Sequence, residues 1–316
     1  MKKIIVTAFT ALVLFSCQND QSESADSKVE AIAHRGCASQ EVLEAQLKAD
    51  PTLAIRMNEI NAFTENAILT KRLVNGKIEI PVVVNVLYRT AAENISNAQI
   101  QTQIDVLNKD FNALNSDYNS VPALFSGVKA NVGITFVLDQ VIRKSTTKTS
   151  WGTSDAMKKT AQGGLAPTSP TTKLNMWSCT IGGGILGYAQ FPGGAAATDG
   201  VVVDPKYFGL SGAANAPFNL GRTATHEVGH WMNLRHIWGD ATCGSDLVSD
   251  TPTHNTANYG VPAYPHYSTC SGTPVEMTMN YMDYVDDNAM YMFSQGQKSR
   301  MAAIFVTGGP RASFGI

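Results

Sequence analysis

The sequence has few charged residues and few histidines. Only 16% of its 316 residues are charged, the formal net charge is -2, and we find no basic run longer than two or three residues. It therefore offers no electrostatic reason to expect binding to nucleic acid. It also lacks internal repeats and heptads, which argues against a repeat array or a coiled coil. The apolar fraction of 44% fits a globular protein with one sizeable domain and a smaller appendage.

Long apolar segments are absent too, except for a short one at the N-terminus. Lys2 and Lys3 precede the apolar run 4–15, which is too short to span a bilayer but typical of a signal peptide. The run ends in Leu-Phe-Ser-Cys17, which resembles the lipobox of bacterial lipoproteins, where the cysteine is acylated. Because Phe15 is larger than the residue usual there, cleavage by an ordinary signal peptidase is the alternative. We expect export in either case, as a lipoprotein of the cell envelope or as a released protein, with lipid at Cys17 as the only membrane contact.

Three of the six histidines lie within eleven residues. His226 and His230 are four positions apart, so on a helix they are offset by only about 40° around its axis and can bind one ion. Glu227 lies beside them, where its carboxylate can take a proton from water. His236 can join them only if the helix breaks first, and Asn233 tolerates the positive φ of such a turn. Three imidazoles leave one tetrahedral position free, which is typical of catalytic zinc; surface histidines matching by chance are the alternative.

Five cysteines in an exported chain invite pairing. Cys243 and Cys270 flank a loop rich in Pro, Gly, Asn and Thr, and we expect a disulfide between them; two unpaired thiols are the alternative. Cys179 lies in an apolar stretch and is interpreted as a buried free thiol. Cys37 could bind zinc as a thiolate, in the position that catalytic water needs, or it could pair with Cys179.

The spacing of apolar residues predicts the secondary structure and an α+β fold. We expect helices over 41–47 and 53–69, a buried strand over 78–88, a helix that Ser96 caps and that extends to Phe111, strands over 132–138, 174–177, 188–191 and 200–203, a zinc helix from about Arg222, and a last helix that Ser294 caps.

We predict three segments in the chain. Residues 1–17 form the signal peptide, and residues 18–72 form a tether and a separate unit, 29–72, that ends in a basic pair. Residues 73–316 form the catalytic domain. Its upper subdomain, 73–238, has a mixed twisted sheet, a backing helix and the zinc helix, and its irregular lower subdomain is 239–316. A cleft separates the two subdomains.

The extended histidine motif, followed by Asn280-Tyr281-Met282-Asp283-Tyr284, resembles the metzincin clan of metallopeptidases. More narrowly, nearly everything from Cys37 to the C-terminal helix resembles the pappalysin family and its short bacterial members of the ulilysin type. The similar segments include 186–192, Asp250-Thr251-Pro252 and the acids that follow the Met282 turn. Asn233 replaces the usual glycine, and we expect slight strain there without loss of metal binding.

The resemblance implies a zinc-dependent metalloendopeptidase (EC 3.4.24 type) that acts on proteins or peptides. Met282 would lie beneath the zinc, where a packed core methionine is the alternative. Tyr284 would donate a hydrogen bond to the tetrahedral intermediate, where a packed aromatic is the alternative. Glu227 would pass the proton of the water to the leaving amine.

The resemblance also implies the substrate-binding residues. Residues 182–184, including Gly184, and the segment with Leu186, Gly187 and Tyr188 would form the edge strand of the upper rim, to which an extended substrate adds by backbone hydrogen bonds; a merely flexible glycine turn is the alternative. Asp287 would lie at the floor of the pocket just after the scissile bond and select Arg or Lys. A solvated or helix-capping acid is the alternative.

Calcium and latency are two further implications of the resemblance. The loop 243–251 is similar to a calcium loop, and its candidate ligands are the carboxylates of Asp246 and Asp250 and the carbonyls of Val248 and Thr251.

Cys37 would belong to a cysteine-switch propeptide, its own chain's inhibitor, that is removed on activation. A preference for Arg or Lys would make self-cleavage plausible at Thr70-Lys71 or Lys71-Arg72. Two other functions stay open: a catalytically silent surface-binding protein on the same fold, and a zinc amidohydrolase for small substrates.

Overall fold

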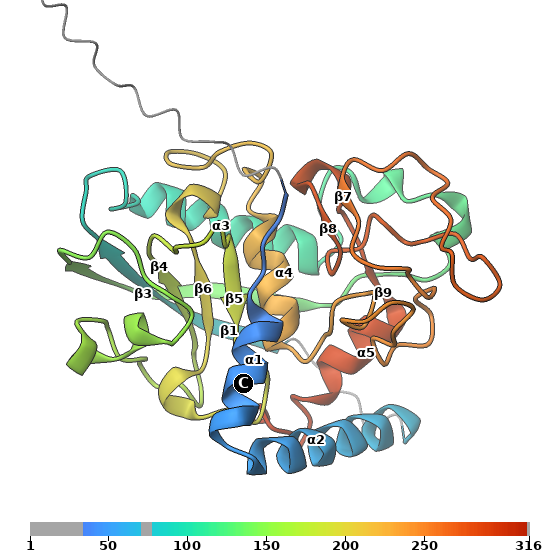
Figure 1. Cartoon of the computed structure of the whole chain (residues 1–316), viewed down its shortest axis with the longest axis horizontal. Coiled ribbons are helices and arrows are strands. Elements are labelled where there is room, and N and C mark those ends of the chain that lie inside the picture. Colours follow the sequence, from blue (N-terminus) through green and yellow to red (C-terminus); the bar gives the residue numbers. More distant parts are fainter. Residues whose placement is uncertain (1–33, 71–77, 315–316) are drawn as a thin grey trace, which may run out of the picture. The chain divides into compact units, whose positions relative to one another are not determined.

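A five-stranded sheet in the order β3-β1-β4-β6-β5 is the frame of the structure (Figure 1). The computed structural model describes residues 34–70 and 78–314. The predicted signal peptide, Cys17 and the basic pair Lys71-Arg72 therefore lie outside the described residues. The strands are β1 (Ile78–Tyr88), β3 (Ile134–Ser145), β4 (Leu174–Ser178), β5 (Gly187–Ala189) and β6 (Val201–Val203).

Four of these strands run parallel, and β5 at one edge is antiparallel to β6. The central strands β1, β4 and β6 are buried almost throughout. A parallel sheet that is covered on both faces has nearly continuous apolar strands, which explains the valine run of β1. The prediction of a mixed sheet is confirmed.

Strand β3 is longer than the sequence predicts. The apolar run ends near Leu138, but the strand continues to Ser145 and pairs with β1 along its whole length. This strand lies at the other edge of the sheet, so its backbone hydrogen bonds to β1 hold it even though most of its second half is exposed or half-buried. A pattern of apolar residues does not reveal such a strand.

Two helices pack on the sheet and on each other. Helix α3 (Asn97–Phe111) contacts β3, and α4 (Arg222–Trp231) contacts β5 and β6. The Ser96 side chain accepts a hydrogen bond from Gln99 N at 3.1 Å, which confirms the predicted cap of α3. Helix α4 is buried along its whole length, beside the edge strand β5. The predicted backing helix and zinc helix are both present.

The region after residue 238 is mostly irregular, as predicted. Its elements are β7 (Tyr259–Gly260), β8 (Tyr284–Val285), β9 (Phe293–Ser294), which pairs with β2 (Lys129–Ala130), and α5 (Gln295–Ala303). Ser294 and Gln297 form a capping box at the start of α5. Short 3-10 helices occur at Tyr118–Ser120, Ala123–Phe125, Ala156–Lys158, Thr160–Gln162, Ala196–Thr198, Pro205–Tyr207 and Asp287–Ala289.

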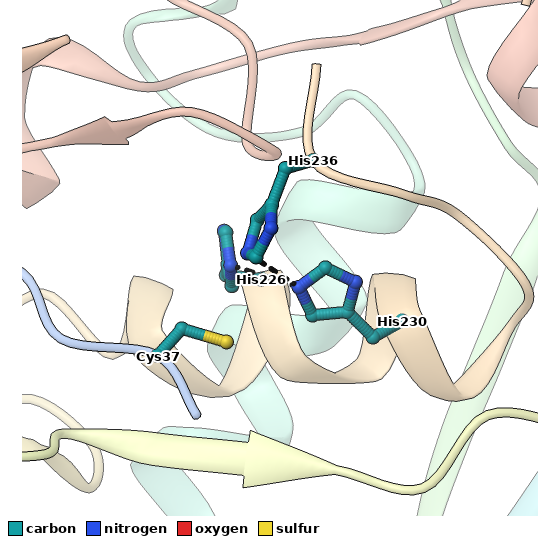
Figure 2. A group of neighbouring side chains, drawn as sticks. All are labelled: Cys37, His226, His230 and His236. Carbon is teal, nitrogen blue, oxygen red and sulfur yellow. Dashed lines mark hydrogen bonds between the residues drawn. The ribbon is translucent and has the colours of Figure 1, made fainter. Parts of the chain in front are cut away.

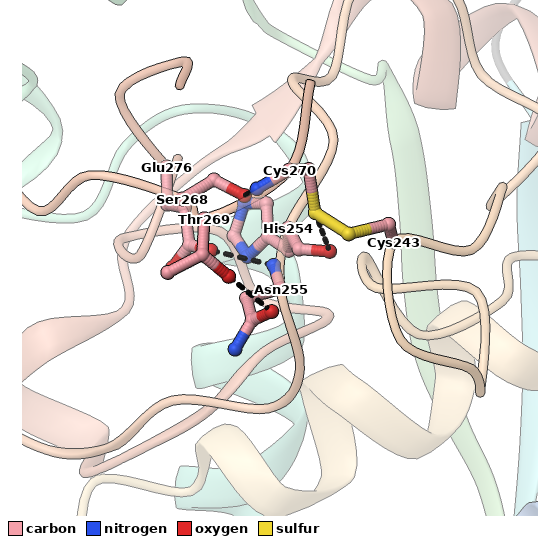
Figure 3. Close-up of a disulfide and its surroundings, with 7 residues drawn as sticks. All are labelled: Cys243, His254, Asn255, Ser268, Thr269, Cys270 and Glu276. Carbon is pink, nitrogen blue, oxygen red and sulfur yellow. Dashed lines mark hydrogen bonds between the residues drawn. A yellow bond between two sulfur atoms is a disulfide. The ribbon is translucent and has the colours of Figure 1, made fainter. Parts of the chain in front are cut away.

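A disulfide joins Cys243 to Cys270, which confirms the predicted pairing (Figure 3). The buried His254 lies beside it, and its carbonyl faces the Cys270 sulfur at 3.5 Å. Next to it, Asn255 N donates to Glu276 Oε1 at 2.7 Å and Asn255 O accepts from Cys243 N at 3.1 Å. The disulfide therefore fixes an irregular segment whose backbone has few partners in regular secondary structure.

The N-terminal described segment lies across the molecule (Figure 1, blue). Residues 34–38 precede α1 (Ser39–Ala49), which contacts β5, and α2 (Thr52–Leu69), which contacts α5. Helix α1 begins two residues before its predicted position and α2 one residue before its own, and Pro51 precedes α2. Among the described residues, we find no helix whose length and apolar character would suffice for crossing a membrane.

Candidate active site

The chain turns back directly after α4, as the sequence requires. Asn233 has φ 74°, and Leu234 N returns to Gly229 O at 2.9 Å. This turn brings His236 to the two histidines of the helix (Figure 2). The Nε2 atom of His230 lies 3.1 Å from that of His226 and 3.0 Å from that of His236. A tetrahedral zinc site has ligand nitrogens about 3.3 Å apart, so the trio has the right spacing for one ion.

The other ring nitrogens fix the chemistry of this cluster. Nδ1 of His226 faces Tyr281 O at 2.7 Å, Nδ1 of His230 faces Leu234 O at 2.8 Å, and Nδ1 of His236 faces Asp240 Oδ1 at 2.5 Å. Since each acceptor requires a proton on Nδ1, all three Nε2 atoms present lone pairs to one another. Only a cation between them makes this arrangement favourable, so the residues fit a zinc ion.

The charge state of the histidines agrees with this assignment. Burial lowers the pKa of His226 well below its ordinary value, and the neighbouring histidines lower it further. The same causes, burial first and then His236, lower the pKa of His230 to about 3. Both rings are therefore neutral near pH 7, as metal ligands must be.

Cys37 completes this group from the N-terminal segment. Its Sγ and the ligand atoms of the three histidines all lie within 4.8 Å of one another, and Figure 2 shows the sulfur facing the imidazoles. Cys37 and Cys179 are both free and buried, so the alternative disulfide between them is not formed. Without a cation, burial and then the nearby Glu227 raise the pKa of the Cys37 thiol well above its ordinary value.

Glu227 is covered by the same segment. Its Oε2 accepts a hydrogen bond from Ser39 Oγ at 2.8 Å and one from Cys37 Sγ at 3.3 Å. Burial raises the pKa of this carboxyl to about 7, against the lowering effect of both hydrogen bonds. Ser39 Oγ also accepts from Ala189 N at 2.8 Å and thereby ties the carboxylate to β5. The sequence did not indicate this role of Ser39.

The Met282 side chain packs against α4 at Gly229. A β-carbon on Gly229 would lie 2.5 Å from Met282 Sδ, so the glycine inside the histidine motif makes room for this methionine. Met282 is fully buried, and its carbonyl accepts from Ile237 N at 3.1 Å, within the loop that carries His236. The predicted Met282 turn therefore supports both the helix and the third histidine. We did not predict this role of Gly229 from the sequence, although the residue lies inside the histidine motif.

Aromatic rings enclose His236. The Tyr284 ring lies 4.8 Å from it, and Trp238 stacks on it at 4.4 Å. The Tyr284 hydroxyl donates to Cys37 O at 3.1 Å. Burial, followed by the charges of Cys37 and Glu227, raises the pKa of Tyr284 well above its ordinary value, so this hydroxyl keeps its proton. Tyr284 thus combines a packed ring with a protonated hydroxyl that donates to a peptide carbonyl.

Asp287 forms a second buried polar cluster, with Arg35 and the start of α4. Its carboxylate accepts from Arg35 Nη2 at 2.5 Å and from Leu220 N at 2.8 Å, and Arg222 N lies 3.3 Å away. Both side chains of the Arg35 pair are almost completely buried. Asp287 therefore caps the start of α4, which was the structural alternative, and at the same time binds a guanidinium.

The same N-terminal segment pairs with the edge strand. Leu186 N donates to Gly36 O at 2.7 Å, and Ala38 N donates to Gly187 O at 3.1 Å. Gly184 has φ 75°, and its carbonyl would lie 2.9 Å from a β-carbon on Gly36.

The predicted edge strand is present only as β5, Gly187–Ala189, whereas residues 182–184 form a turn with positive φ at Gly183 and Gly184, which was the alternative for the three glycines. Tyr188, however, is fully buried, and its hydroxyl faces Asp155 at 3.0 Å. Its side chain belongs to the core, so it can contribute to the cleft only through its backbone.

Known proteins are similar to this chain over most of its length. Residues 179–306 match the model of the M43 peptidase family, described as pregnancy-associated plasma protein-A. Extracellular metalloprotease 1 of Coccidioides posadasii is 33% identical over 244 residues, which are 73% of this chain and 78% of that protein. This chain belongs to the pappalysin family.

Two solved structures are also similar to this pappalysin. A promirolysin mutant of Tannerella forsythia has a TM-score of 0.81 and 38% identity, covering 89% of this chain and 97% of that one. Mature mirolysin from T. forsythia, in complex with a cleaved peptide, has a TM-score of 0.74 and 41% identity, covering 77% of this chain and 97% of that one. The pappalysin is therefore a metalloendopeptidase, and its family implies zinc. Its extracellular relatives support export.

In the predicted calcium loop of this pappalysin, the two carboxylates accept hydrogen bonds from other groups of the protein. Asp246 accepts from Val248 N at 3.1 Å and from Thr251 Oγ1, which also donates to Val248 O at 3.0 Å. Asp250 accepts from Ser294 Oγ at 2.6 Å and from Gly296 N at 2.8 Å, at the start of α5. The two carboxylates thus face different partners. Calcium binding stays a prediction.

Proposed function

We propose that this pappalysin is exported as a latent zinc endopeptidase that cleaves peptide bonds in front of Arg or Lys. One observation carries the proposal. Arg35 and Asp287 form a buried ion pair, while Cys37, two residues later, faces the three histidines. A single short segment thus occupies the metal position and the adjacent side-chain pocket at once. A substrate would need both places for its scissile bond and for the residue after it.

His226, His230 and His236 would hold the metal. Zinc, when bound, supplies Lewis-acid polarisation of the scissile carbonyl and makes water more acidic. Glu227 then accepts the proton of the attacking water and delivers it to the leaving amine. The protonated Tyr284 hydroxyl donates a hydrogen bond to the oxygen on which negative charge develops. In the latent form that hydroxyl donates to Cys37 O, which stands in for a substrate carbonyl.

Latency would follow from the contacts of residues 34–70. Cys37 takes the ligand position that water needs, and Ser39 holds the carboxylate of Glu227. The similarity to promirolysin supports a propeptide. We therefore assign residues 18–72 to a tether and propeptide and residues 73–316 to the catalytic domain. Removal of the propeptide exposes Gly187, Asp287 and the histidines together.

The Arg35 contacts supply the argument for specificity. Nε donates to Val285 O at 3.3 Å, Nη1 donates to Thr223 Oγ1 at 3.1 Å, and the guanidinium lies 5.0 Å from the Phe218 ring. Together with the Asp287 carboxylate, these groups match a planar cation. A lysine ammonium can reach the carboxylate but loses the other contacts, so we expect arginine to be preferred over lysine.

Cleavage-site profiling tests the proposed function. The processed enzyme is incubated with a peptide library, and zinc is measured on the same sample. We expect about one zinc per chain and cuts before Arg more than before Lys. Glu227→Gln should keep the zinc and lose turnover by a factor of 100 or more, because no base remains. Cleavage by Glu227→Gln, or undiminished cleavage after zinc is removed, would contradict the mechanism.

Asp287→Asn separates specificity from catalysis. We expect it to lower kcat/KM for peptides with Arg after the scissile bond at least 10-fold, because the amide no longer neutralises the guanidinium. Asp283→Asn is less suitable as a control, since Asp283 also accepts buried hydrogen bonds. Asp286→Asn is the better matched variant, because the adjacent Asp286 makes no side-chain ion pair among the described residues. Equal losses in Asp286→Asn and Asp287→Asn would refute the assignment.

Activation by self-cleavage is part of the proposal. The candidate sites, Thr70-Lys71 and Lys71-Arg72, have a basic residue after the cut. N-terminal sequencing of the mature wild-type protein should place the cut there, and a Glu227→Ala protein should stay unprocessed. Identical processing of both proteins would rule out self-cleavage.

We also propose that Cys17 is acylated. A Cys17→Ser variant should lose label from a radioactive fatty acid and leave the membrane fraction. If the label and the distribution are unchanged, the ordinary signal peptide is the correct alternative.

A further inference from the structure

A cavity of about 320 Å³ lies beside the cluster of three histidines, on the side opposite to the Arg35–Asp287 pair. The N-terminal segment shows this order, because Arg35 lies on Asp287, Cys37 faces the histidines, and Gln40 and Leu43 then line the cavity. Seven of the thirteen lining residues belong to α1 and α2, the helices of the proposed propeptide. Removal of these helices would therefore take away about half of the lining and expose the other residues. Its volume is sufficient for one or two side chains of a ligand.

The lining residues that would remain after removal of the propeptide are mostly polar, and two of them are arginines. The catalytic domain contributes the residues Phe191, Asn233, Arg235, Gly239, Asp240 and Arg300. The one acid among them, Asp240, is engaged with His236 Nδ1. Two arginines thus face a space in which the only carboxylate already has a partner.

Arg300 is an unusual buried cation. Its exposed fraction is only 2%, yet among the described residues no carboxylate lies within ion-pair distance of it. Its Nε donates to Asn233 O at 2.7 Å, its Nη2 donates to Asn61 Oδ1 at 2.7 Å, and Nη1 makes no hydrogen bond in the described part of the chain. Burial, followed by repulsion from Arg235, lowers its pKa to about 10. Buried guanidinium groups are normally paired with an acid.

One of the two acceptors of Arg300 comes from the proposed propeptide. Asn61 lies in α2, so its Oδ1 would leave with the propeptide and free the Nη2 hydrogen that it accepts, beside an Nη1 that already lacks a partner among the described residues. Asn233 also lines the cavity, and its buried amide Nδ2 has no hydrogen-bond partner within residues 34–70 and 78–314. In the mature enzyme the Arg300 guanidinium and the Asn233 amide would therefore present N–H donors, and Arg300 a positive charge, that no acceptor of the propeptide meets any longer. Such a place favours an anionic oxygen ligand.

We propose that Arg300 and Arg235 form a subsite for an acidic side chain on the N-terminal side of the scissile bond. The substrate would then be a peptide with Glu or Asp a few residues before the cut and Arg just after it. In the latent form Asn61 occupies the subsite as a neutral substitute for that carboxylate. This inference rests on the proposed function, because it places the cavity relative to a peptide bond at the histidines.

Matched peptides test the subsite on the processed enzyme. Each peptide carries Arg after the scissile bond, and Glu, Gln, Ala or Lys is placed in turn at each of the four positions before it. At one or two of these positions, we expect kcat/KM for the Glu peptide to exceed that for the Gln peptide about 10-fold, mostly through KM, because a charge-assisted hydrogen bond is stronger than a neutral one. The Lys peptide should be the poorest.

Two variants connect this preference to the arginines. Arg235→Gln should lower the Glu-to-Gln ratio to about 3 or less, because one of the two cations is lost. Arg300→Lys should lower it as well, because the planar donor group is lost. Each ratio is measured on one enzyme sample, so a general loss of stability or zinc affects both peptides equally. Arg89→Gln, which makes the same charge change outside the cavity, should keep the wild-type ratio.

The outcomes separate this inference from the proposed function. If no peptide with Arg after the cut is hydrolysed, the proposed function fails. If such peptides are cleaved but Glu, Gln and Ala are equivalent at all four positions, only the acidic subsite is overturned. A Glu preference that survives in both Arg235→Gln and Arg300→Lys would overturn the assignment to these arginines.

Discussion

At the scale of single residues, the site depends on groups that orient the histidine rings through their Nδ1 atoms. Asp240 is the clearest case, because it fixes the ring of His236, the histidine that lies outside the helix. It has φ 58°, a conformation that Asn and Gly also tolerate. The carboxylate keeps the proton on Nδ1 and so leaves Nε2 free for the metal.

Asp240→Gly should therefore weaken zinc binding about 10- to 100-fold, as is typical when the partner of a ligand histidine is removed. Asp240→Asn keeps an acceptor and the backbone conformation, so we expect a smaller effect. Competition with a chromogenic chelator measures the affinity. Equal affinities of the wild type and Asp240→Gly would show that the turn alone orients His236.

Asp246 gives a prediction about pH. Burial raises the pKa of this carboxyl to about 6, although Thr251 and Val248 donate to it. An acid whose pKa is raised in the folded state stabilises that state most at low pH. Its contribution is fully present below about pH 4 and is lost as the pH rises through 6, with a magnitude on the order of 3 kcal/mol.

Urea unfolding between pH 4 and 7 tests this dependence. Asp246→Asn keeps an oxygen acceptor for Val248 and Thr251 and removes the charge. Relative to this variant, the wild type should lose stability as the pH rises. Calcium at the predicted loop would offset the loss at pH 7 in the wild type and much less in the variant. If calcium leaves the melting temperature of the wild type unchanged at pH 7, the calcium prediction is wrong.

At the scale of secondary-structure elements, the exit from α4 decides whether the three histidines meet. Asn233 is in the left-handed region, and Arg300 holds its carbonyl from α5. Family members usually have glycine at this position, which avoids steric strain there. The buried amide of Asn233 also has no hydrogen-bond partner among the described residues.

We expect Asn233→Gly to change the free energy of unfolding by less than about 1 kcal/mol, because glycine removes both the strain and the unpaired amide while the unfolded chain gains entropy. Asn233→Val should cost about 2 kcal/mol or more and reduce zinc content, since a β-branched residue resists positive φ. Denaturant unfolding and zinc analysis measure both. A valine variant as stable as the glycine variant would contradict this account of the turn.

At the scale of the whole molecule, Arg311 connects the C-terminal segment to α4. Its two Nη atoms lie 2.8 and 2.9 Å from the Asp199 carboxylate, and its guanidinium covers the Trp231 ring at 3.8 Å. Trp231 Nε1 donates to the same carboxylate at 3.1 Å. The last residue of the zinc helix is therefore held by a residue that is eighty positions later in the sequence.

Arg311→Met should destabilise the protein by about 3–5 kcal/mol, because it leaves the buried Asp199 without its cation. Arg311→Lys keeps the charge but loses the paired geometry, so we expect a loss of about half that size. The double variant Arg311→Met with Asp199→Asn should recover part of the stability. If Arg311→Met costs less than 1 kcal/mol, the buried pair is not what holds this end of the chain.

The sequence by itself determined the features that depend on local spacing. The four-residue spacing of His226 and His230, the turn residue before His236 and the cap at Ser294 each follow from helix geometry and backbone preference. The bounds of β1 and α3 follow from continuous or periodic apolar residues in the same way. These features need no knowledge of distant segments.

Only the tertiary structure decided which residues from distant segments meet. Arg35 and Asp287 are 252 positions apart, and Ser39 reaches Glu227 across 188, so no local pattern could join them. Nor could the sequence show that Arg300 is buried without an acid or that Tyr188 faces the core. The reason is physical. Local energetics select helices and strands, whereas the packing of complete elements selects the pairs of side chains that lose water together.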